Sequence, residues 1–288
     1  MDRCYYGFGI ILMMIIIILT ITILSYSITK TVPHITPATE SGSITFQINS
    51  SDVKIIHRTW HTYEINQHMY NDAYLSWIKM NPDYTMVWNT IEDCEIFMKQ
   101  FPEAYQAWKK VIPLAYKSDL WRACKLYYEG GVYADAYCKP YVSINQMINK
   151  VNVPLYMALE TGWDEHGMHN GFIISQPKHP FYKQYIKDMI ANINFCVENG
   201  FQSMTGPVCF KKSILKVLGK NYKFKLGLND NFYLWEFNTN KIYDNHKLIL
   251  DKKYDILDSY IYRKFYLTYK GGPHHYEQCY KTGKLCLE

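Results

Sequence analysis

The residues best suited to polar chemistry lie in one stretch, residues 117–141. Asp119 and Arg122 are three residues apart, so on a helix they share one face. Asp135 follows residues 132–134, a short run with strand character. Ligands of open α/β sheets bind beyond the carboxyl ends of the strands. An ion pair on a helix face and a carboxylate at a strand end therefore predict a polar binding site, although a surface ion pair and a loop aspartate would give the same pattern.

Two glycines end the helix that must carry this pair. Gly130 and Gly131 can adopt the left-handed conformation of a C-cap without a Cβ clash, and Pro113 suits the helix start. Strand patterns recur at residues 53–57, 84–88, 154–160, 171–175 and 232–235, with helical patterns at 66–80, 102–111, 179–195 and 208–218 and a polar loop at 162–170. This alternation predicts an α/β fold, with a mostly parallel sheet and helices on both faces.

An apolar segment precedes this body. Residues 9–28 are almost entirely apolar, and about 20 such residues suffice for a helix that crosses a bilayer. The apolar region of a cleaved signal peptide is usually shorter. We therefore expect one N-terminal transmembrane helix that acts as an uncleaved signal anchor, with a signal peptide as the alternative.

The anchor sets the expected domain organisation. Residues 1–8 would be a short cytosolic tail, residues 29–51 a stem rich in Ser, Thr and Pro, and residues 52–288 the folded domain. We expect a single-pass type II arrangement, with the folded domain lumenal, in a membrane of the ER or Golgi type. Asn49 begins an Asn-Ser-Ser sequon and is a candidate glycosylation site in the stem.

Charge and cysteine content exclude some classes of function. The net charge of +5 is spread along the chain without a dense Lys/Arg block, so a nucleic-acid partner is not expected. The eight cysteines include no CxxC pair, which argues against a zinc finger. Cys279 and Cys286 flank a short C-terminal loop and are the pair we expect first as a disulfide.

Six short motifs occur in a characteristic order. They are IIHRTW (55–60), NPDYTMVW (81–88), KSDLWR (117–122), GGVYAD (130–135), HNGFIIS (169–175) and TGP (205–207). In this order they resemble the DXD-type sugar-binding glycosyltransferases of family 32, which include fungal Golgi and sphingolipid mannosyltransferases. The clostridial glucosylating toxins are more distantly similar.

The resemblance implies a GT-A fold and a membrane-anchored enzyme. This enzyme would transfer a hexose, with retention of configuration, from a GDP- or UDP-sugar to a glycan, lipid or protein acceptor. The implied catalytic residues are Asp119, Arg122 and Asp135, and the implied donor-binding residues are Trp60, Ser118, Asp119, Arg122, Tyr133, Asp135 and Asn170. Trp60 would stack on the base, and Asp135 would be the first Asp of the DXD element. The leaving diphosphate develops negative charge that Arg122 and a divalent cation, Mn²⁺ or Mg²⁺, could stabilise.

The sequence departs from the family pattern at the DXD element, which here reads Asp135-Ala136-Tyr137. The second Asp, which binds the metal in relatives, is a tyrosine, whose phenol has a pKa of about 10 and is a poor ligand at neutral pH.

Three outcomes follow from this departure. The metal is held by Asp135 with His274 or His275; or the enzyme works without a metal, through Arg122 and lysines; or catalysis is lost. In the last case the protein is an inactive lumenal binding or scaffold protein with the GT-A fold.

Overall fold

The structure, a computed structural model, describes residues 54–60, 67–148, 151–161, 167–197, 202–251 and 276–287. The predicted cytosolic tail, membrane anchor and stem with Asn49 lie outside these residues, and so do His274 and His275. Within the described ranges, no helix has both the length and the apolar character needed to cross a bilayer.

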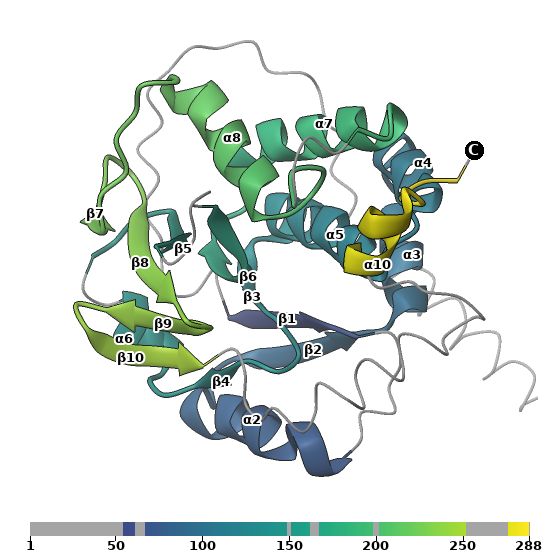
Figure 1. The fold of residues 1–288 in the computed structure, drawn as a ribbon. Coiled ribbons are helices and arrows are strands. Elements are labelled where there is room, and N and C mark those ends of the chain that lie inside the picture. The colour runs from purple at the N-terminus through teal and green to yellow at the C-terminus, as the bar shows by residue number, and fades with distance from the viewer. Residues whose placement is uncertain are drawn as a thin grey trace, which may run out of the picture. The chain divides into compact units, whose positions relative to one another are not determined.

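The described residues form a ten-stranded sheet with helices packed against it (Figure 1). The strands are β1 (Ile55–Thr59), β2 (Thr85–Asn89), β3 (Gly131–Ala134), β4 (Lys139–Pro140), β5 (Leu155–Glu160), β6 (Met168–Ser175), β7 (Gly227–Leu228), β8 (Tyr233–Asn238), β9 (Lys241–Asp244) and β10 (Lys247–Asp251). The helices are α2 (Gln67–Met80), α3 (Ile91–Met98), α4 (Pro102–Lys110), α5 (Leu114–Glu129), α6 (Ile144–Ile148), α7 (Pro180–Asn194), α8 (Pro207–Leu218) and α10 (Tyr276–Thr282).

The strand order is β2-β1-β3-β6-β5-β8-β9-β10-β4, with β7 paired to β8. Only β1–β2, β1–β3 and β5–β8 are parallel among the described pairs, so the prediction of a mostly parallel sheet was wrong and the sheet is mixed. The reason lies after β5, which ends at Glu160, while β6 already begins at Met168. A connection this short cannot carry a parallel crossover, which takes a dozen or more residues. Part of the predicted loop 162–170 is therefore strand.

The sheet is buried on both faces, and β3 shows how. Tyr133 belongs to the apolar cluster shared with α3, α4, α5, α7 and α8, whereas Val132 and Ala134 belong to the cluster shared with α2 and α6. This alternation follows from the two-residue side-chain period of a strand. Figure 1 shows α5, α7 and α8 on one side of the sheet and α2 on the other. The predicted helices on both faces are therefore confirmed.

Local sequence signals place α5 and β3 end to end. Gly130 ends α5 with a φ of 69°, and Gly131 opens β3 with a φ of 99°. A Cβ on Gly131 would lie 2.9 Å from the carbonyl oxygen of Ile55, because β1 packs directly beside it. Gly130 ends the helix, as predicted, and Gly131 additionally permits the close approach of β1, which the sequence did not indicate.

The disulfide of the described residues joins Cys196, just after α7, to Cys286 near the C-terminus. The predicted Cys279–Cys286 pair was wrong. Cys279 lies on α10 and is buried in the core with 2% of its surface exposed. The chain after α10 instead runs beside the end of α4, where Val111 and Cys286 form a bridge, and this places Cys286 near the end of α7.

We expect the double substitution Cys196→Ser/Cys286→Ser to lower the free energy of unfolding by about 2–4 kcal/mol, because the crosslink restricts the unfolded chain. Urea unfolding of the two proteins measures this difference. Peptide mapping under non-reducing conditions provides the control, since it should recover a peptide pair joined through Cys196 and Cys286. A crosslink through Cys279 would contradict the assignment.

Candidate active site

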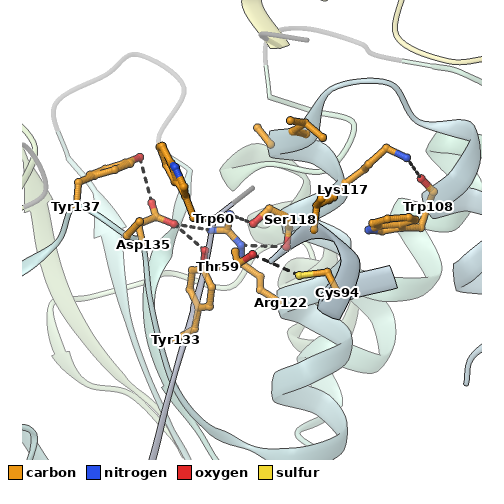
Figure 2. A pocket seen from close by; sticks show the side chains of 14 residues that line it. Thr59, Trp60, Cys94, Trp108, Lys117, Ser118, Arg122, Tyr133, Asp135 and Tyr137 are labelled. Carbon is orange, nitrogen blue, oxygen red and sulfur yellow. Dashed lines mark hydrogen bonds and ion pairs between the residues drawn. The ribbon is translucent and has the colours of Figure 1, made fainter. Parts of the chain in front are cut away.

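A cavity of about 100 Å³ opens where β1 and β3 end and the first half of α5 passes (Figure 2). It is lined by Thr59, Trp60, Ile91, Cys94, Trp108, Leu114, Ala115, Lys117, Ser118, Arg122, Tyr133, Asp135, Ala136 and Tyr137. The carboxyl ends of adjacent parallel strands are the usual ligand site of an α/β sheet. The volume is below the roughly 300–1,000 Å³ of typical small-molecule pockets. The cavity therefore represents the floor of a site and does not enclose a whole ligand.

Arg122 is the centre of the polar network at this floor. Its Nη2 lies 3.1 Å from Asp119 Oδ1, and its Nη1 lies 3.4 Å from Asp135 Oδ1. Nη1 also donates to the carbonyl oxygen of Asn170 at 2.7 Å, and Nη2 donates to Ser118 Oγ at 3.2 Å. The spacing of Asp119 and Arg122 on one helix face is thus confirmed, and the helix delivers both to the Asp135 carboxylate.

The charge of Arg122 is secured by its surroundings. Burial lowers the pKa of Arg122, but Tyr133, Asp119 and Asp135 raise it, and the net shift is upward. Burial raises the pKa of Tyr133 well above its ordinary value, so its phenol stays neutral. The Tyr133 hydroxyl donates to Asp135 Oδ1 at 2.9 Å, and its ring lies 4.4 Å from the guanidinium of Arg122. The floor therefore holds a fixed cation.

Asp119 braces Arg122 from the interior. Its Oδ1 accepts from Asn170 Nδ2, and its Oδ2 accepts from Thr205 Oγ1, both at 2.9 Å. Asp119 and Asn170 are buried and do not line the cavity, so here they position other groups. Of the predicted donor-binding residues, those that line the cavity are Trp60, Ser118, Arg122, Tyr133 and Asp135.

In the degenerate DXD segment, both oxygens of the Asp135 carboxylate contact neighbouring side chains. The Tyr137 hydroxyl donates to Asp135 Oδ2 at 3.4 Å, as Figure 2 shows. Asp135 is 9% exposed, and its carboxylate also faces Arg122 and Tyr133. In the described part of the chain, no three His, Cys, Asp or Glu side chains are grouped so that they could hold a metal ion. The described lining of the cavity thus offers a divalent cation one carboxylate, that of Asp135. Both of its oxygens already face Arg122 or a tyrosine hydroxyl, which makes it a poor fit to the cation.

The predicted Mn²⁺ or Mg²⁺ site needs a protein ligand in addition to Asp135. Its further ligands, His274 or His275, lie outside the described residues, so that site stays a prediction.

Arg58 is a site residue that sequence reasoning missed. It is fully buried, and its Nη2 donates to the carbonyl oxygens of Asp135, at 3.0 Å, and of Ala136. Its guanidinium lies 5.6 Å from the ring of Trp88 and 6.0 Å from that of Trp77. Burial lowers the pKa of Arg58 to about 10, so it remains a cation at neutral pH. The available signal was an arginine inside an otherwise buried strand, which demands a partner.

Gly171 was also missed, and it determines where the Asp135 carboxylate can lie. The Asp135 amide donates to the Gly171 carbonyl at 2.8 Å. A Cβ on Gly171 would lie 3.1 Å from Asp135 Cγ, nearer still to Asp135 Oδ2, and 2.9 Å from His169 Nε2. Only a glycine leaves this space.

We expect Gly171→Ala to lower the free energy of unfolding by about 1–3 kcal/mol, because the added methyl overpacks a buried site. Urea unfolding measures this effect. In an Asp135→Ala background the methyl group has more room, so the same substitution should cost less. An equal cost in both backgrounds would contradict the assigned contact.

Comparison with known families identifies a region around this site. Residues 67–153 match the family described as "Glycosyltransferase sugar-binding region containing DXD motif". The match includes Asp119, Arg122 and Asp135 and confirms the predicted resemblance to DXD-type glycosyltransferases, whereas the assignment to family 32 stays a prediction. The match also supports the prediction that the protein is a glycosyltransferase. A search of curated proteins returns no significant match.

Solved structures with partial similarity include three glycosyltransferases. The PaToxG glycosyltransferase has a TM-score of 0.44 and 17% identity over 58% of this chain and 70% of its own. The glycosyltransferase domain of the YGT toxin has a TM-score of 0.37 and 10% identity, with coverage of 59% and 69%. Mouse xyloside xylosyltransferase 1 has a TM-score of 0.39 and 10% identity, with coverage of 61% and 85%. Similarity at this level carries no information about the substrate.

Proposed function

We propose, starting from the glycosyltransferase sugar-binding region in this chain, that the protein transfers a hexose from a nucleotide sugar to an acceptor hydroxyl, with retention of configuration. One observation carries the proposal: Arg122 is fixed between Asp119 and Asp135 at the floor of a cavity that Trp60 also lines. A nucleotide sugar offers the groups that this cavity can bind, namely a flat base, hydroxyls and a diphosphate.

Each lining residue has a chemical task in this reaction. The partly exposed indole of Trp60 offers an aromatic face on which a base can stack. Arg122 places a permanently charged guanidinium beside the cavity, and its charge favours the diphosphate, which carries more negative charge when it leaves. Asp135 holds the guanidinium and the Tyr133 hydroxyl in place, and such fixed donors stabilise developing charge without reorganising.

The proposed transfer is a substitution at the anomeric carbon of the donor sugar. The bond between this carbon and the diphosphate oxygen breaks, and its electron pair leaves with the nucleoside diphosphate. The acceptor hydroxyl oxygen forms the new bond to the anomeric carbon, and its proton passes to the leaving phosphate oxygen. The protein supplies orientation and positive charge to this exchange.

We also propose a type II membrane protein whose catalytic domain is lumenal. The apolar residues 9–28 support an anchor. The Cys196–Cys286 disulfide supports an oxidising compartment, because such bonds persist there and are rare in the cytosol. A glycan, a lipid or a protein in that compartment would be the acceptor.

A second candidate function is an inactive binding protein that keeps the fold, and Tyr137 is the observation that favours it. It predicts nucleotide binding without turnover.

Turnover of donors separates the two functions. Full-length protein in detergent is incubated with a panel of UDP- and GDP-sugars, and the released nucleoside diphosphate is measured. Release above the level of a Trp60→Ala/Asp135→Asn double variant is expected for at least one donor. Nucleotide binding without release would establish the second candidate, and the absence of both binding and release would refute both.

A further inference from the structure

The substitution of tyrosine at position 137 changes the charge balance of the donor site. In a DXD site with a bound dication, the second carboxylate and the metal together contribute one net positive charge. Tyr137 is neutral at pH 7 and contributes none. One additional protein cation beside the diphosphate is therefore enough to restore the same net charge.

Lys117 is a second basic residue in the lining of this cavity. It lines the same cavity as Arg122 and Tyr137. Its Nζ donates to the carbonyl oxygen of Trp108 at 2.6 Å and lies 4.2 Å from the centre of the Trp108 ring. These contacts hold the ammonium group at the Trp108 wall of the cavity. Figure 2 shows the Lys117 side chain directed toward Trp108, while Asp135 and Tyr137 lie on the other side of Arg122.

Asp135 is correspondingly less open to a metal ion. Its Oδ1 already accepts from Tyr133 and faces Arg122, and its Oδ2 accepts from Tyr137. A cation at Oδ2 would have to displace the Tyr137 hydroxyl, and none of the other described residues that line the cavity carries a carboxylate.

Arg58 adds permanent positive charge behind the same segment. Its guanidinium binds the carbonyl oxygens of Asp135 and Ala136. It therefore raises the potential at the cavity floor and fixes the backbone that carries Asp135 and Tyr137. Because Arg58 is fully buried, solvent screens this charge little.

We propose that this site binds the diphosphate of its donor through Lys117 and Arg122, with Arg58 behind them, and that nucleotide binding needs no divalent cation. The inference rests on the proposed function, because a nucleotide sugar is its ligand. It adds that the site has exchanged metal binding for protein cations.

Calorimetric titration of the full-length protein with UDP and GDP tests the inference. Each titration is run in EDTA, in Mn²⁺ and in Mg²⁺. We expect the Kd of the preferred nucleotide to change by less than about twofold between EDTA and metal. Lys117→Ala should weaken binding by about tenfold in all three buffers, which corresponds to about 1.4 kcal/mol.

Two variants sharpen this test. Lys109→Ala is the matched control, because Lys109 is an exposed lysine whose Nζ also lies against an aromatic ring, Tyr105 at 5.0 Å, but it does not line the cavity. Its binding should equal that of the wild type. Tyr137→Asp restores a second carboxylate, so it should weaken binding in EDTA and recover it in Mn²⁺.

A gain of tenfold or more from Mn²⁺ in the wild-type protein would overturn the inference and leave the proposed function intact. Loss of that gain in a His274→Ala/His275→Ala variant would then place the metal at the tail histidines. No binding of either nucleotide under any condition would overturn the inference and the proposed function together.

Discussion

Arg122→Met is expected to lower the free energy of unfolding by about 3–5 kcal/mol, because it leaves buried carboxylates without their cation. Asp119 and Asp135 are only 6% and 9% exposed, and both form ion pairs with Arg122. Methionine retains much of the length and apolar volume of the side chain, so the loss reports charge and hydrogen bonds more than packing. Urea unfolding followed by circular dichroism measures it.

Lys99→Met is the matched control for this experiment. Lys99 lies 3.6 Å from Glu95, and the two side chains are 56% and 40% exposed. Exposed pairs of this kind contribute about 0–1 kcal/mol, so Lys99→Met should change the free energy of unfolding by no more than this. A similarly small effect of Arg122→Met would show that the two buried carboxylates do not depend on Arg122.

Asp135→Asn is expected to reduce turnover of the preferred donor by about 100-fold, because it loosens the groups that must be fixed for transfer. The amide is nearly isosteric but carries no charge to hold the guanidinium of Arg122, and its nitrogen cannot accept a hydrogen bond from Tyr133 or Tyr137. The measurement is the initial rate of nucleoside diphosphate release at saturating donor.

The chain offers a close control in Asp244. Asp244 is 6% exposed and accepts the hydroxyl of Tyr233 at 2.8 Å, much as Asp135 accepts that of Tyr133. It lies on β9 and does not line the cavity. The folded fraction of Asp244→Asn should therefore turn over the donor at the wild-type rate. Equal turnover losses in the two variants would attribute the effect of Asp135→Asn to folding.

Local features of the fold were predictable from the sequence because they depend on neighbouring residues. The glycines at 130 and 131 marked the end of α5, and Pro113 marked its start. Strand direction was not predictable in this way, since periodicity indicates a strand but not its partner. The strands β5 and β6 are antiparallel, and the first residues of β6, from Met168, had been predicted as part of the loop 162–170.

The same limit applied to the site. Asp119 and Arg122 were predicted together because helix spacing connects them. Arg58 binds the backbone of Asp135, which is 77 residues away, and Thr205 binds Asp119 across 86 residues. No spacing rule reaches this far, and these contacts required the sheet order that brings β1, β3 and β6 together.

The Cys196–Cys286 bond illustrates a further limit. Cys279 and Cys286 are closer in sequence, but Cys279 is buried in the core. Cys286 instead bonds to Cys196, just after the end of α7. Short separation along the chain favoured the wrong pair, because the folded path of the C-terminal residues decides which thiols meet.

The position of the donor site is best tested by an experimental structure of the protein with the nucleoside diphosphate, UDP or GDP, that it binds more tightly. We expect the base to lie against Trp60 and the diphosphate to lie beside Arg122 and Lys117, in the cavity at the ends of β1 and β3. A nucleotide bound elsewhere, with this cavity empty, would contradict the assignment of the site.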